Sequence, residues 1–110
     1  MSDIYRTTGS AAMTAANASY TKTEIGPELV EVRLHLSAAA VAAENFVIYI
    51  DSINGTAYDV ILFTQAMATV QDVIYRPDTP IRLLSTGDKF VFTYTNTNAR
   101  TWGLECRLEK

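Results

Sequence analysis

Apolar and polar residues alternate in several short runs of this sequence, and turn-forming residues separate the runs. From residue 30 to residue 36 every second residue is Val or Leu, and charged residues or histidine stand between them. The same period of two returns at residues 90–95 and 102–109. Successive side chains of a β-strand point to opposite faces, so this pattern predicts strands with one buried face.

Two further runs, residues 45–52 and 58–65, flank the pair Asn54-Gly55. Asn-Gly supplies the positive φ angles of a tight turn, so the two runs are predicted to form an antiparallel hairpin. The second run is apolar on both faces, which predicts a strand covered on two sides by a second sheet or a partner subunit. The residues expected at a subunit interface are Tyr58, Ile61 and Phe63.

About seven or eight such runs, spaced by roughly ten residues, predict an all-β antiparallel sandwich. The 110 residues suit one compact domain. The sequence leaves open whether the strands connect as a jelly roll or as an immunoglobulin-like sandwich. The alanine-rich stretch 38–44 is too short for an independent helix and is expected to be a loop.

Residues 1–27 differ in composition from the β-sandwich domain expected at residues 28–110. They are rich in Ala, Thr, Ser and Asn and close with Gly26-Pro27. With so little apolar surface to offset the entropy of ordering, this segment is predicted to be an extended N-terminal arm that lies on another molecule. The anchors expected to bind that partner are Ile4, Tyr5, Met13 and Tyr20.

Charge, the length of apolar runs and cysteine content exclude several classes of function. The formal net charge is −3 and no cluster of basic residues occurs, which argues against nucleic acid as a partner. No apolar run is long enough to cross a membrane. One cysteine, Cys106, rules out an intramolecular disulfide and any Cys-rich zinc site.

Candidate catalytic and metal-binding residues do not form a recognisable pattern. His35, the single histidine, has no nucleophile at a triad-like spacing, and Cys106 falls on an apolar strand face where a structural thiol is expected. The segment Asp51-Ser52-Ile53-Asn54-Gly55 places an isoleucine where a calcium loop needs an oxygen ligand. We therefore expect no enzymatic activity, no cofactor and no catalytic or metal site.

Aromatic residues suggest one alternative function. Tyr side chains in or beside the predicted strands, together with Trp102, could stack on sugar rings as in a carbohydrate-binding module for host attachment. Core packing and subunit contact explain the same residues. The tyrosines concerned are Tyr49, Tyr58, Tyr75 and Tyr94.

Several segments together resemble small virion structural proteins of tailed bacteriophages. The resemblance spans roughly residues 28–108. Its segments are Glu28-Leu29-Val30-Glu31-Val32-Arg33-Leu34-His35-Leu36, Glu44-Asn45-Phe46, Tyr58-Asp59-Val60, Gly87-Asp88, Tyr94-Thr95-Asn96-Thr97 and Trp102-Gly103-Leu104.

This resemblance implies a capsid decoration or cement protein. It would be made in the host cytoplasm and located in the virion, where it would bind the major capsid protein or other virion proteins as a homotrimer. A tail or head-to-tail connecting component is the alternative within the same family. Symmetry would multiply one modest interface over the shell.

Overall fold

Nine β-strands and one short 3-10 turn make up the described part of the chain in a computed structural model, residues 2–23 and 27–109. All strand pairs are antiparallel, and these residues contain no α-helix. The elements are β1 (Ser2–Gly9), β2 (Ser19–Thr21), β3 (Glu28–Leu36), β4 (Asn45–Asp51), η1 (Thr56–Tyr58), β5 (Val60–Ala66), β6 (Asp72–Tyr75), β7 (Ile81–Arg82), β8 (Lys89–Thr93) and β9 (Trp102–Glu109).

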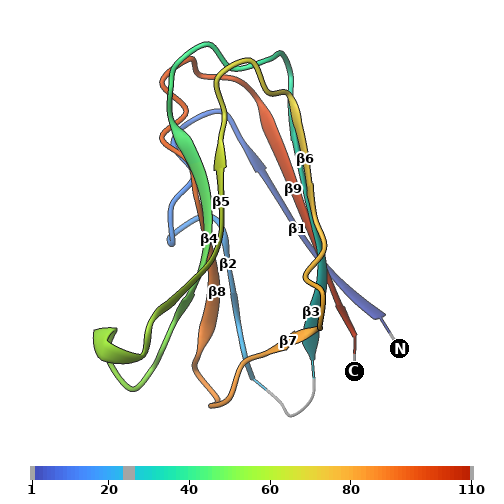
Figure 1. The fold of residues 1–110 in the computed structure, drawn as a ribbon, viewed down its shortest axis with the longest axis vertical. Coiled ribbons are helices and arrows are strands. Elements are labelled where there is room, and N and C mark those ends of the chain that lie inside the picture. Colours follow the sequence, from blue (N-terminus) through green and yellow to red (C-terminus); the bar gives the residue numbers. More distant parts are fainter. Residues whose placement is uncertain (1, 24–26, 110) are drawn as a thin grey trace.

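The strands form two facing sheets, which confirms the predicted β-sandwich (Figure 1). One sheet has the order β1-β9-β3-β6, with β7 added beside β3, and the other has the order β2-β8-β4-β5. In this order consecutive strands mostly cross from one sheet to the other, which is the jelly-roll arrangement. The exceptions are β4–β5 and β6–β7, whose members lie in the same sheet. The pairing of β4 with β5 confirms the predicted antiparallel hairpin, but residues 52–59, including η1, replace the expected tight turn, and only Gly55 of the Asn-Gly pair has a positive φ.

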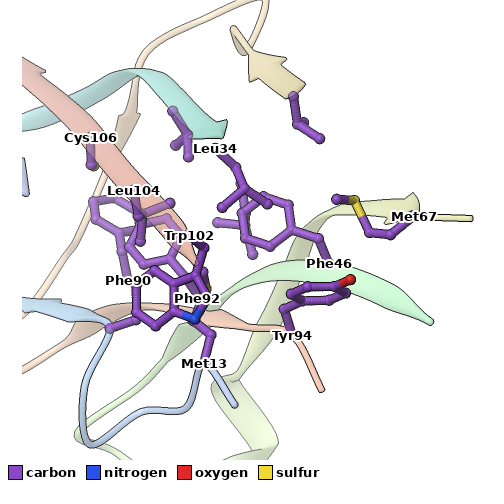
Figure 2. Close-up of a cluster of buried hydrophobic side chains, with 14 of the residues drawn as sticks. Met13, Leu34, Phe46, Met67, Phe90, Phe92, Tyr94, Trp102, Leu104 and Cys106 are labelled. Carbon is purple, nitrogen blue, oxygen red and sulfur yellow. The ribbon is translucent and has the colours of Figure 1, made fainter. Parts of the chain in front are cut away.

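The core fills the space between the sheets with the alternating residues of the facing strands (Figure 2). Side chains of β8 and β9 meet there, and Trp102 is only 1% exposed. Its indole Nε1 donates a hydrogen bond of 2.9 Å to the carbonyl of Ala11. The largest fully buried residues are Trp102, Tyr94, Phe46, Phe90, Phe92, Met13, Leu29, Leu34, Leu36, Ile48, Met67 and Leu83.

The N-terminal segment is part of this sandwich, and the prediction of a separate arm is wrong for the residues that the structure describes. β1 pairs with β9 over eight residues, from Ser2 opposite Glu109 to Gly9 opposite Trp102. Further along, Met13 pairs with Tyr94 in an isolated bridge, and β2 pairs with β8. Backbone pairing, which composition does not report, supplies the contacts that the segment lacks in apolar side chains. Residues 24–26 of the expected arm lie outside the described residues.

Side-chain hydrogen bonds fasten the loops at one end of the sandwich. The buried Asn96 donates to the carbonyls of Ser10, Ala11 and Arg100. Asn98 accepts the backbone N–H groups of Val41 and Ala42, and so holds the alanine-rich stretch. That stretch is a loop, as expected from its short length.

Candidate functional site

The four residues predicted to anchor the arm lie in different environments within this one chain. Tyr5 stacks on Phe92 with ring centroids 6.5 Å apart, and its hydroxyl accepts a hydrogen bond from the backbone N–H of Ser19. Tyr20 meets Tyr5 edge-on at 6.4 Å, and Met13 is buried. Ile4 alone is exposed, at 51%. Three of the four residues thus pack within their own subunit instead of facing outward.

The three residues predicted at a subunit interface divide into an exposed pair and a partly buried one. Tyr58, in η1, is 65% exposed and Ile61, in β5, is 70% exposed. Phe63 is partly buried and stacks on Tyr75 of β6, with ring centroids 4.5 Å apart. Phe63 therefore joins the edges of the two sheets, which leaves Tyr58 and Ile61 as the residues available for contact with another molecule.

The outer face of the five-stranded sheet is charged and largely neutralised by its own ion pairs. Arg6 lies 2.7 Å from Glu105, and Glu31 accepts hydrogen bonds from Arg76 at 2.9 Å and from Arg33. Hydrogen bonds first from Arg76 and then from Arg33 lower the pKa of Glu31. The exposed pair of Arg6 with Glu105 stabilises the fold by little, whereas Glu31 is only 8% exposed and its carboxylate is already occupied by two arginines.

His35 lies on the surface and Cys106 in the core, the positions that the strand pattern predicted. His35 is on that same outer face, with its Nδ1 2.5 Å from Oδ1 of Asp72, and both side chains are largely exposed. Cys106 is fully buried between the sheets, and this burial raises its pKa to about 12. The thiolate form needed for nucleophilic attack is therefore not populated at neutral pH.

The carboxylates near Asn54-Gly55 serve the loops. Asp59 accepts the backbone N–H of Ser52 at 2.8 Å. Asp88, which is 4% exposed, accepts the N–H groups of Ile53 at 2.9 Å and Ser85 at 3.0 Å. Within residues 2–23 and 27–109, no group of three or more His, Cys, Asp or Glu side chains is arranged to hold a metal ion. No helix in the same ranges has the length and apolar character to span a membrane.

Aromatic residues do not gather into a sugar-binding groove. Trp102 and Tyr94 are each 1% exposed, because both point into the core. Tyr75 is occupied by its stacking on Phe63. Of the four tyrosines predicted for this role, Tyr58 alone has more than half of its surface exposed.

A hollow of about 550 Å³ lies where the hairpin of β4 and β5 meets the segment after β7. We call it the end cleft. Its apolar lining includes Tyr58, Val60 and the 85% exposed Leu84, and Arg82 stands among them. The full lining is Ile50, Ser52, Asn54, Tyr58, Val60, Arg82, Leu83, Leu84, Ser85 and Asp88.

Sequence reasoning did not identify Arg82 and Leu84 as site residues. Residues 81–84 indicated no more than a short strand before a turn. The one available signal was the adjacent pair Leu83-Leu84, because neighbouring residues of an extended segment point to opposite sides and one of the two must face outward. In the structure Leu83 is 2% exposed and Leu84 faces solvent.

Comparisons with known proteins find similarity at the level of structure and not of sequence. No family model matches this sequence, and no curated protein matches it. One of the matching structures, a crystal structure of PirA, is similar over 94% of this chain and 90% of that chain. The two share 14% identity with a TM-score of 0.48. At this level of similarity no functional residue is carried over from PirA.

The predicted relationship to phage virion proteins is wrong. No family model and no curated protein supports it, and the solved structure described above is of PirA, not of a phage protein. The functions predicted from the sequence are contradicted as well. These are the capsid decoration or cement protein, the tail or head-to-tail connecting component, and the sugar-binding module for host attachment. The segments that suggested the relationship are strand and turn patterns, which unrelated β-sandwiches share. The virion localisation and the capsid protein as partner followed from that relationship alone.

Proposed function

We propose that this chain is a non-enzymatic protein that works as a homo-oligomer, in which β5 pairs with β5 of a second copy. The observation that supports this most directly is the edge strand itself. β5 (Val60–Ala66) is the last strand of its sheet, contains no charged residue, and exposes Val60 by 50% and Ile61 by 70%.

An exposed edge strand presents backbone N–H and C=O groups that can pair with another strand. Proteins usually protect such edges with charges, prolines or very short strands. The other edges of this sandwich have such protection. β2 has three residues, β1 carries Asp3 and Arg6, and β6 has four residues followed by Arg76-Pro77. β5 has seven residues and none of these features.

The strand is suited to pairing with itself. Two copies related by a two-fold axis place β5 antiparallel to β5, so that the same surface contacts its equivalent and the assembly closes with two subunits. No like charges would face each other, since the strand has none. Such a pair would join two four-stranded sheets into one continuous sheet.

A dimer formed in this way differs from the homotrimer expected from the sequence. A trimer would require β5 to pair with a different edge of the next copy, and the remaining edges are shorter or charged. The exposed Tyr58 and Ile61 extend the contact beyond the strand backbone. This matters because a stable interface buries roughly 800 Å² on each partner, more than one strand pair supplies.

Two observations support the absence of enzymatic activity. Cys106 is buried with a raised pKa, and the ion pair of His35 with Asp72 lies on an open, charged sheet face. Acid–base catalysis favours groups placed where water is excluded, which that face does not provide. Binding and assembly are the functions that such a surface can perform.

Light scattering coupled to size-exclusion chromatography tests the proposal on the full chain. The unmodified protein is expected to elute as a dimer at micromolar concentration. Ile61→Lys places a charge on the pairing edge and is expected to give a monomer. The matched control is Ile74→Lys, which changes an isoleucine with 56% exposure on β6 and is expected to leave the dimer intact.

The outcomes distinguish the alternatives. A protein that stays monomeric over the whole concentration range contradicts the proposal. A trimer, or an Ile61→Lys variant that remains dimeric, shows that a different surface forms the assembly.

A further inference from the structure

The end cleft has walls that the fold itself holds in place. Asp88 connects the two sides, because one carboxylate oxygen accepts the N–H of Ile53 and the other accepts the N–H of Ser85. Asn54 also reaches across, with its side-chain nitrogen 3.4 Å from Oγ of Ser85. Ile53 packs closely over Gly87, where a Cβ atom would lie 3.1 Å from Cγ1 of Ile53. The cleft is thus preorganised and needs no ligand to order it.

The turn that carries Tyr58 is equally well fixed. The backbone N–H of Tyr58 donates to the carbonyl of Gly55 at 3.1 Å, and the N–H of Asp59 donates to Thr56 at 3.2 Å. Gly55 has a φ of 116°, a conformation that favours glycine. An aromatic side chain that is 65% exposed on a rigid turn loses little entropy when a ligand packs against it.

Among the residues that line the end cleft, Arg82 is the one with a positive charge. Arg82 lies opposite Glu28 in the pairing of β7 with β3, yet in the described ranges no carboxylate oxygen lies within 4.0 Å of its guanidinium nitrogens. The nearby carboxylate of Asp88 is already occupied by backbone N–H groups, and hydrogen bonds first from Ile53 and then from Ser85 and Leu84 lower its pKa. The remaining polar residues of the lining, Ser52, Asn54 and Ser85, are uncharged.

We propose that the end cleft binds a small organic anion whose apolar, planar body packs against Tyr58, Val60 and Leu84 and whose carboxylate pairs with Arg82. A guanidinium group matches a carboxylate with two parallel hydrogen bonds. The volume of about 550 Å³ lies within the range of small-molecule sites. Tyr58 and Val60 also lie at or beside the pairing edge of β5, so the cleft shares these two residues with the proposed interface. The inference concerns the cleft of one subunit and does not require the dimer.

Naphthalene-2-carboxylate serves as the probe, and naphthalene-2-carboxamide as the uncharged molecule of the same shape. Binding to the full chain is followed by amide chemical-shift changes in a two-dimensional NMR titration. The carboxylate is expected to shift residues 52–60 and 82–88. It is also expected to bind about tenfold more tightly than the carboxamide, the difference typical of a charge-assisted hydrogen-bond pair.

Two variants assign the charge and the apolar contact. Arg82→Gln is expected to weaken the carboxylate by about tenfold and to leave the carboxamide unchanged. Tyr58→Ala is expected to weaken both probes to a similar extent, because both lose the same apolar contact. The matched control is Arg107→Gln, which removes an exposed arginine from β9 and is expected to change neither affinity.

The proposal is overturned by any of three results. They are equal affinities for the two probes, an unchanged carboxylate affinity in Arg82→Gln, and shifts that map outside the end cleft. Repeating the titration with Ile61→Lys separates this site from oligomerisation, since the variant retains every residue that lines the cleft.

Discussion

The N-terminal segment and β5 have opposite compositions and opposite environments. Residues 2–23 are poor in large apolar groups, yet β1 pairs along its whole length and Met13 is 1% exposed. β5 is apolar on both faces, yet it forms a sheet edge with Ile61 70% exposed. The contrast shows that the position of a strand in the sheet order, and not its hydrophobicity alone, determines how much of it is buried.

β1 is held in the fold, despite its few apolar residues, by a small number of specific contacts. Its backbone pairs with β9, Tyr5 reaches the core to stack on Phe92, and Gly9 allows the indole of Trp102 to lie close to the main chain. β5 has more apolar surface but only one neighbouring strand, β4. Each strand therefore needs a different experiment to test its role.

The largest expected effect separates the two regions directly. Tyr5→Ala removes the stacking on Phe92 and the hydrogen bond from Ser19, and is expected to lower the free energy of unfolding by about 3 kcal/mol. Ile61→Ala is expected to lower it by less than about 0.5 kcal/mol, because the side chain is mostly exposed. Urea denaturation measured on monomeric protein checks both values. Similar losses for the two variants would remove the contrast between the regions.

A smaller effect tests the close contact between the N-terminal segment and the core. A Cβ atom on Gly9 would lie 2.9 Å from Cζ2 of Trp102, whose ring is buried and held by Ala11. Gly9→Ala is therefore expected to destabilise the fold by about 2 kcal/mol. On the neighbouring strand β9, a Cβ atom on Gly103 would have nothing within 4 Å. Thermal unfolding should show that the melting temperature of Gly103→Ala is unchanged or slightly raised. If Gly9→Ala were as stable as the unmodified protein, β1 would pack more loosely than described.

The smallest effect concerns Asp88, where the two regions meet. Its carbonyl accepts the N–H of Lys22 at the end of the N-terminal segment, while its carboxylate holds Ile53 in the hairpin that leads to β5. Asp88→Asn keeps one acceptor oxygen and replaces the other with a donor, so we expect a loss of about 1 kcal/mol at pH 7. Asp72→Asn, at an exposed ion pair, is expected to lose less than about 0.5 kcal/mol.

Asp88 also contributes to the pH dependence of the free energy of unfolding. Because the pKa of Asp88 is lower in the folded chain than in the unfolded one, the unfolded state binds the proton more readily. Its contribution to stability is complete above the unfolded pKa, near pH 4, and is lost as the pH falls through the folded pKa. Glu31 acts in the same direction. Unfolding free energies measured from pH 7 to pH 2 should fall less steeply in Asp88→Asn, and an unchanged slope would contradict the role given to this carboxylate.

The sequence predicted the features that depend on local alternation. The strands around residues 30–36, 90–93 and 102–109 lie where the period of two indicated, and the hairpin around Asn54-Gly55 pairs as expected. Cys106 is buried because it shares a strand face with Leu104 and Leu108. These predictions succeed because the side-chain direction in a strand follows from sequence position alone.

Features that depend on strand order were beyond the sequence. Composition could not show that β1 pairs with β9, since backbone hydrogen bonds carry no side-chain signature. Nor could it show that β5 is an edge, which follows from the jelly-roll order. The end cleft joins Tyr58 and Arg82 from separate elements, so neither residue's neighbours in the sequence indicate it.

Burial of Cys106 has a practical consequence for labelling. With its only native sulfhydryl enclosed in the core and a pKa of about 12, the protein should resist maleimide reagents while folded. A cysteine substituted at a solvent-facing position would then be the single fluorophore attachment point, without first removing the native one. Distances between such labels on two copies could be measured by energy transfer in an otherwise unaltered chain.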